Sequence, residues 1–166
     1  EKVSAASRAN VVILTRQGNS ANERGCMGAY PWTGPTLKTY FSPIALIHLQ
    51  TGVSKSPSDL KGEKVLAFCG IGNPQSFLKM LTDLGADVCE SVVFEDHYNY
   101  TAWDIKELEK KSKNLSLKRI VTTEKDAIKI ESLAVSGIDI FVLQIEIRFI
   151  EPTTVWERHL VLKNET

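Results

Sequence analysis

Short runs of apolar residues, many of them β-branched, recur along the chain at intervals that leave room for helices. Runs of this length are typical of strands that are buried on both faces of a parallel sheet. We expect strands at residues 11–15, 44–48, 65–69, 88–94, 119–123 and 138–147. The hydrophobic pattern therefore predicts a sheet whose strands are spread over the whole chain.

Amphipathic stretches follow the later strands and begin with helix-start signals. Asn73 is a good N-cap with Pro74 directly after it, and Thr101 resembles the first residue of a capping box. We expect helices at residues 74–84, 101–113, 124–133 and 154–162. Strands that alternate with helices predict an α/β fold with a mostly parallel, doubly wound sheet. The length of 166 residues predicts a single domain, residues 1–166.

One segment departs from this pattern. Residues 17–41 are rich in glycine and proline and show no helical or strand periodicity. A structureless loop of this length is unusual inside a compact domain. We therefore expect an irregular segment within the domain, either a functional flap or an insertion.

The composition is ordinary for a globular protein and argues against several functions. Lysine plus arginine and aspartate plus glutamate both number 20, so the formal net charge is zero. This balance gives no support for binding to nucleic acid or to an anionic surface. The three cysteines share no metal or redox spacing, which favours a reducing compartment. The three histidines are dispersed, so we expect no dedicated metal site.

The strand expected at residues 88–94 leads directly into a stretch of ionisable and aromatic residues. Asp96 and His97 are adjacent and lie beside Tyr98 and Tyr100. In α/β proteins, residues just past the C-terminal end of a buried strand face a crevice. A proton-handling or phosphate-facing role fits that position. The alternative is a polar loop in which His97 only satisfies local hydrogen bonds.

Gly70 and Gly72 lie between a strand and a helix, as they do in dinucleotide-binding proteins. That fingerprint needs a third glycine three residues after the second, where this chain has Gln75. The helix start at Asn73 could still accept an anion, because its first amides are unpaired. The alternative is a tight turn in which the glycines allow close packing of the helix against the strand.

The sequence Thr122-Thr-Glu-Lys-Asp126 lies where a strand becomes a helix. Thr123 is a suitable N-cap, and Glu124 and Asp126 favour the positive end of the helix dipole. These local effects alone account for the sequence. The functional alternative is that Lys125 contacts a phosphate, or Glu124 a base or a sugar, in the crevice.

Three blocks of sequence, taken in order, resemble one family. They are Leu66-Ala-Phe-Cys-Gly-Ile-Gly-Asn-Pro74, Phe94-Glu-Asp-His-Tyr-Asn-Tyr-Thr101 and Val121-Thr-Thr-Glu-Lys-Asp-Ala-Ile-Lys129. The family is that of the tetraacyldisaccharide 4'-kinases, the lipid A 4'-kinases of Gram-negative envelope biosynthesis. The segment from Arg8 to Arg16 also resembles the family, with Asn10 in place of its usual aspartate.

The resemblance implies a P-loop kinase fold and a phosphoryl transfer. The γ-phosphate of ATP would pass, with Mg²⁺ present, to the 4'-hydroxyl of a tetraacyldisaccharide 1-phosphate. The matching block implies that His97 is catalytic and that Asp96 orients it. The residues expected to face the cofactor are Glu124, Lys125, Gly70, Gly72 and Asn73.

The family's phosphate loop, Mg²⁺-binding acids and catalytic carboxylate precede the region that this chain resembles. The chain contains no Gly-x-x-x-x-Gly-Lys-[Ser/Thr] sequence. We therefore expect the C-terminal part of the kinase, without the N-terminal half that holds the phosphate loop, and inactive alone. ATP, Mg²⁺ and the membrane surface are expected to be bound mainly by that other half. The expected location is the cytoplasmic face of the inner membrane, or an organelle equivalent. Two alternatives stay open, a nucleotide- or dinucleotide-binding module and a non-catalytic remnant of the kinase.

Overall fold

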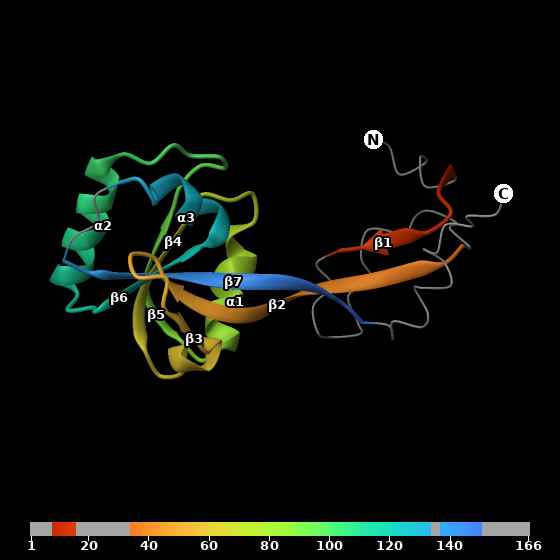
Figure 1. Cartoon of the computed structure of the whole chain (residues 1–166), viewed down its shortest axis with the longest axis horizontal. Helices are drawn as coiled ribbons and strands as arrows, with labels where there is room; N and C mark the ends of the chain where they lie inside the picture. The colour runs from red at the N-terminus through yellow and green to blue at the C-terminus, as the bar shows by residue number, and fades with distance from the viewer. Residues whose placement is uncertain (1–7, 16–33, 134–136, 151–166) are drawn as a thin grey trace. The chain divides into compact units, whose positions relative to one another are not determined.

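The computed structural model describes residues 8–15, 34–133 and 137–150 of the chain (Figure 1). The helix expected at residues 154–162 and most of the segment at 17–41 lie outside these residues. Chain length predicts one domain, and the contacts within the chain separate two compact units. Unit 1 is Glu1–Ser42 with Glu146–Thr166, and unit 2 is Pro43–Ile145.

Strands and helices alternate in the order that the hydrophobic pattern predicts. The elements are β1 (Val12–Leu14), β2 (Thr36–His48), β3 (Ser54–Lys55), the 3₁₀ helix η2 (Pro57–Leu60), β4 (Lys64–Cys69), α1 (Pro74–Asp83), β5 (Asp87–Val93), α2 (Ala102–Asn114), β6 (Arg119–Thr123), α3 (Glu124–Ile130) and β7 (Asp139–Phe149). Each predicted strand overlaps one of these strands, and β3 is an addition. Helix α3 ends at Ile130, three residues earlier than predicted.

The expectation of irregular structure at residues 17–41 is wrong for residues 36–41, which belong to β2. The cause is pairing with another strand. Val12 and Leu14 of β1 lie beside Thr36 and Lys38 in a parallel ladder, and the amide of Val12 donates to Pro35 O. Ladder hydrogen bonds satisfy backbone groups that a loop would leave to water, so they extend the strand beyond its apolar part.

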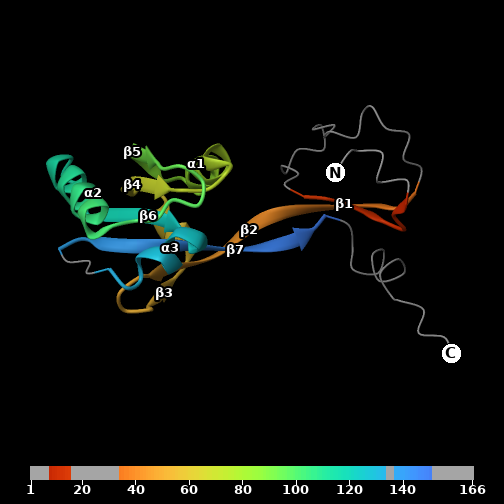
Figure 2. The ribbon, with the colours of Figure 1, turned by 90° about the horizontal axis from the view of Figure 1, so that it is seen from above.

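The sheet of unit 2 contains the strand order β5-β4-β6-β7, continued by β2 beside β7, which Figure 2 shows from above. The pairs β4 with β5, β4 with β6 and β6 with β7 are all parallel. Strand β2 lies beside β7, and β3 pairs with β2 in the antiparallel direction. The predicted parallel arrangement is therefore confirmed for β5, β4, β6 and β7 of an α/β fold.

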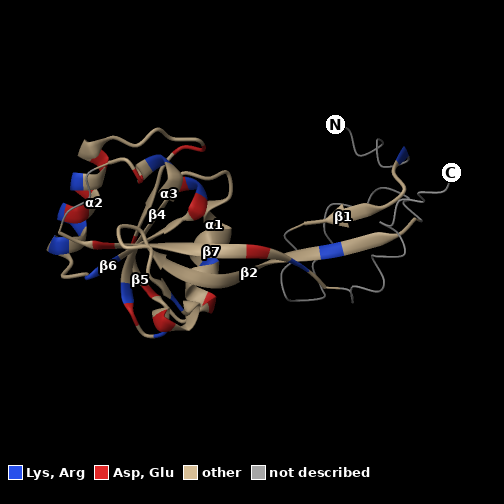
Figure 3. Cartoon of the chain, viewed as in Figure 1, with Lys and Arg blue, Asp and Glu red and all other residues tan. Residues whose placement is uncertain are grey.

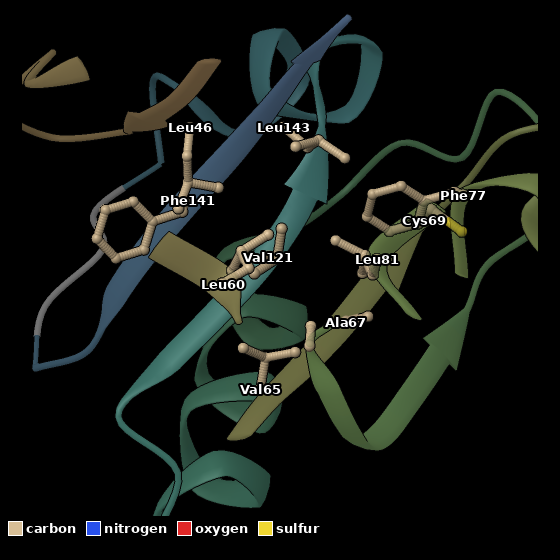
Figure 4. Close-up of a cluster of buried hydrophobic side chains, with 11 residues drawn as sticks. Leu46, Leu60, Val65, Ala67, Cys69, Phe77, Leu81, Val121, Phe141 and Leu143 are labelled. Atoms are coloured by element: carbon tan, nitrogen blue, oxygen red, sulfur yellow. The ribbon is translucent and has the colours of Figure 1, made fainter. Parts of the chain in front are cut away.

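Two apolar clusters cover opposite faces of this sheet. On one face, Val65 and Ala67 of β4 pack with Phe77 and Leu81 of α1 (Figure 4). On the other face, Leu66 and Phe68 pack with residues of α2 and α3, namely Ile105, Leu108 and Ile130. Successive side chains of a strand point to opposite faces, so β4 is buried on both sides. Each large side chain buried in this way contributes about 1.5–3 kcal/mol.

Side-chain caps fix where the helices of unit 2 begin. Asn73 accepts a hydrogen bond from the amide of Ser76 at 3.2 Å, as its position before Pro74 predicts. Thr101 and Asp104 form the predicted capping box of α2. Among the residues described, no helix has the length and apolar character needed to cross a bilayer.

The chain continues from β4 first to one side of the sheet and then to the other, which creates a topological switch point beside β4. From β4 the chain passes through α1 to β5 on one side, and then through α2 to β6 on the other side. Ligands of open α/β sheets bind where the strand order reverses in this way, beyond the C-terminal ends of the strands. In unit 2 that position lies beyond Cys69 and Thr123.

Candidate functional site

Three loops meet at the C-terminal ends of β4, β5 and β6. The amide of Gly70, after β4, donates to Asp126 Oδ2 at 3.0 Å. The hydroxyl of Tyr100, after β5, donates to Asp126 Oδ1 at 3.0 Å. The amide of His97 donates to Gly70 O at 3.3 Å. The three blocks that resemble the family therefore converge on one place.

Asp126 is the centre of this arrangement, and its side chain is fully buried. The hydroxyl of Thr123 also donates to Oδ2, at 2.7 Å, and in turn caps α3 by accepting from the amide of Asp126. Lys129 Nζ lies 3.9 Å from Oδ1. Buried carboxylates are stable only when donors surround them, and this one accepts hydrogen bonds from three different residues.

Tyr100 holds the loop between β5 and α2 against the sheet. Its ring packs edge-on against Phe68, Phe94 and Tyr98, with ring centroids 5.0–5.6 Å apart. Burial and the neighbouring Asp126 raise the pKa of Tyr100, so its hydroxyl keeps the proton that it donates. Burial raises the pKa of the nearby Cys69 thiol to about 11, and Asp126 adds to the effect.

Asp96 and His97, the predicted catalytic pair, lie in a turn that is open to solvent. The side chain of His97 is 84% exposed, and its Nε2 lies 3.8 Å from Oδ2 of Asp96, which is 54% exposed. The amide of Tyr98 donates to Glu95 O at 3.1 Å and closes the turn. His97 occupies the third position of this turn with φ +62°, a left-handed conformation that is uncommon for residues other than glycine.

The two glycines after β4 allow close packing. A Cβ at Gly70 would lie 2.9 Å from the hydroxyl oxygen of Tyr100 and 3.1 Å from Glu95 O, and a Cβ at Gly72 would lie 3.2 Å from Asp96 Oδ2. The N–H and C=O of Gly70 are both hydrogen-bonded inside the protein. These contacts favour the packing explanation for Gly70-Ile-Gly72.

Glu124 and Lys125 begin α3, a helix that contains both acidic and basic residues (Figure 3). Glu124 Oε2 accepts a hydrogen bond from the amide of Ile145 at 3.2 Å, which ties α3 to β7. Lys125 is exposed. Of these two candidates, Lys125 is therefore the one directed at solvent, where a ligand could reach it.

The sequence alone relates Asp126 only to the helix dipole and does not predict its central position. A signal was present, because Thr123-Glu-Lys-Asp126 has the spacing of the capping box Thr101–Asp104. Both aspartates accept from the hydroxyl of their own cap threonine. Hydrogen bonds from Thr101 also hold the pKa of Asp104 below its usual range. In the part of the chain that the structure describes, no group of three or more His, Cys, Asp or Glu residues could hold a metal ion.

Comparisons with known proteins agree on one family. The family model described as "Tetraacyldisaccharide-1-P 4'-kinase" matches residues 1–163. The tetraacyldisaccharide 4'-kinase of Syntrophus aciditrophicus is 34% identical over 94% of this chain and 44% of its own length. That of Halothermothrix orenii is 31% identical over 89% of the chain and 43% of its length. The chain thus spans less than half the length of these relatives.

A solved structure gives the same picture for the fold. The crystal structure of LpxK from Aquifex aeolicus in complex with ATP matches with a TM-score of 0.53 and 23% sequence identity. The match covers 90% of this chain and 41% of that protein. At this identity the likeness establishes a common fold.

Proposed function

The chain belongs to the tetraacyldisaccharide-1-P 4'-kinase family, and from this premise we propose that it forms the C-terminal part of an ATP-dependent lipid kinase. The reaction is transfer of the γ-phosphate of ATP to the 4'-hydroxyl of a tetraacyldisaccharide 1-phosphate in lipid A biosynthesis. The observation that carries the proposal is the convergence of the three family-like blocks around Asp126 at the switch point of the sheet.

The proposed architecture is that part of a P-loop kinase fold which lacks the phosphate loop. Parallel strands with helices on both faces and a switch beyond β4 and β6 support this proposal. The likeness to the Aquifex aeolicus protein, which was solved with ATP, supports it as well.

His97 is the proposed catalytic residue of this part of the kinase. Its imidazole is exposed beyond the C-terminal end of β5, where it can handle the proton of an attacking hydroxyl together with a carboxylate from another part of the kinase. Asp96, whose Oδ2 lies 3.8 Å from the ring, orients the imidazole. The left-handed backbone of His97 supports a functional role, since such conformations cluster at active sites.

Among the described residues, no group of three or more His, Cys, Asp or Glu side chains could hold a magnesium ion. The buried carboxylate of Asp126 already accepts hydrogen bonds from Gly70, Tyr100 and Thr123. We therefore assign Mg²⁺ and most contacts with ATP to the rest of the kinase, and no step of the reaction to an ion held here. Within this chain, Lys125 is the cation proposed to meet a phosphate.

The proposed acceptor is a lipid, so the complete kinase is expected to work at a membrane surface. We propose the cytoplasmic face of the inner membrane, or an organelle equivalent, and contact through the part of the kinase outside this chain. This chain supplies the crevice wall that carries His97.

The experiment that tests the proposal is an assay of the complete gene product with radiolabelled ATP, Mg²⁺ and a tetraacyldisaccharide 1-phosphate. We expect a labelled 4'-phosphate product, and we expect none from the 166-residue chain alone. Absence of product from the complete protein would overturn the kinase assignment in favour of a non-catalytic remnant. Turnover by the chain alone would overturn the proposed division of the active site.

A further inference from the structure

Gly70 connects the buried carboxylate of Asp126 to the exposed His97. Its N–H donates to Asp126 Oδ2 at 3.0 Å, and its C=O accepts from the amide of His97 at 3.3 Å. Both polar groups belong to one residue without a side chain, and a Cβ there would collide with the Tyr100 hydroxyl. A movement of Gly70 would therefore be passed directly to the backbone of His97.

Tyr100 connects the same carboxylate to the other side of the turn. Tyr100 follows His97 by three residues, and its hydroxyl donates to Asp126 Oδ1 at 3.0 Å. Two connections therefore join the turn that presents His97 to Asp126. One runs from the amide of His97 through Gly70, and the other runs through Tyr100, which follows the turn. The two connections use different oxygen atoms of one carboxylate, so each has an acceptor of its own.

The backbone of His97 needs such support. Its φ of +62° is disfavoured for a residue with a Cβ, and such conformations persist only where the surrounding structure determines them. Within the turn itself, the closing hydrogen bond runs from Tyr98 N to Glu95 O and does not include His97. The amide of His97 is held by Gly70, which Asp126 holds in turn.

We propose that Asp126 is a positioning residue that sets the orientation of His97 from beneath the crevice; this inference rests on the proposed kinase function. The carboxylate itself does not reach the reacting groups, because it is fully buried. It keeps the His97 imidazole directed at the crevice, and its loss should reduce the rate of the chemical step more than the binding of ATP.

The test compares three variants of the complete gene product. Asp126→Asn replaces one acceptor oxygen by an N–H₂ group that faces donors, and Tyr100→Phe removes a single hydroxyl from the same network. Ser112→Ala is the matched control, because it also removes a fully buried hydrogen bond, to Leu117 O, but far along α2. The measurements are kcat, KM for ATP, and the backbone amide signal of His97 in protein labelled with [¹⁵N]histidine, with His48 as the internal reference.

We expect Asp126→Asn to lower kcat by roughly 100-fold, the effect of a displacement of about 1 Å in a catalytic group. Tyr100→Phe should lower kcat by a smaller factor, KM for ATP should stay within about twofold of the parent, and Ser112→Ala should match the parent. The His97 amide signal should move in Asp126→Asn and Tyr100→Phe and stay in place in Ser112→Ala.

If the parent is active, an unchanged kcat in Asp126→Asn, or a His97 amide signal that does not move in that variant, would overturn the inference. A parent without kinase activity would contradict the proposed function instead, and the His97 signal alone would then decide whether Asp126 positions the turn. Where Asp126→Asn does not fold, Tyr100→Phe decides, since it leaves the buried carboxylate in place.

Discussion

The junction of β6 with α3 and the turn before α2 each bring an aspartate to the same edge of the sheet, and the two carboxylates differ in burial and in hydrogen bonding. Asp126 is fully buried and accepts hydrogen bonds from three other residues. Asp96 is half exposed, and its Oδ2 lies 3.8 Å from Nε2 of the still more exposed ring of His97. A carboxylate enclosed by donors fixes geometry, whereas an exposed pair stays available to a substrate.

The largest expected difference between the two regions is in stability. Asp126→Ala would leave the donors of Gly70 and Tyr100 buried without an acceptor and would remove the acceptor of Thr123, and we expect it to lower the free energy of unfolding by about 3–5 kcal/mol. Asp96→Ala should change it by less than about 0.5 kcal/mol, as is usual for exposed positions. Urea denaturation followed by circular dichroism measures both, and similar losses for the two variants would contradict the comparison.

A smaller effect of opposite sign is expected at His97. His97→Gly should raise the free energy of unfolding by roughly 0.5–1 kcal/mol, because glycine removes the cost of a positive φ and loses only part of that gain to its greater freedom when unfolded. Ser116, with φ +54°, is the matched control outside the crevice, and Ser116→Gly should stabilise the protein by a similar amount. The same denaturation experiment applies. A destabilised His97→Gly variant beside a stabilised Ser116→Gly variant would show that the turn does not strain the His97 backbone.

Local signals in the sequence were sufficient for most of the fold. The strands of unit 2 are short apolar runs, and the caps at Asn73, Thr101 and Thr123 depend on residues only three positions away. Strand β2 was predicted too short, because Pro43 and the polar residues near it do not look like strand. What extends β2 is its pairing with β1, which local sequence does not contain.

The site was predictable in its chemistry but not in its connections. The blocks around His97 and Glu124 could be identified, and the structure brings them together with Gly70. The partners of Asp126 lie 56 residues away at Gly70 and 26 residues away at Tyr100, so only the folded sheet reveals them. The positive φ of His97 is likewise a property of the turn in its surroundings.

The exposed His97, held by the buried network, is proposed to take part in phosphoryl transfer. The most direct measurement is turnover of the complete gene product with a tetraacyldisaccharide 1-phosphate and ATP, before and after His97→Ala. We expect turnover to fall by about 100-fold or more, as for the loss of a general acid–base group, with the free energy of unfolding nearly unchanged, because alanine also carries a Cβ at the positive φ. Lys79→Ala, which removes an exposed ion pair with Asp83 on α1, should leave turnover unchanged. A His97→Ala variant as active as the parent would contradict the account.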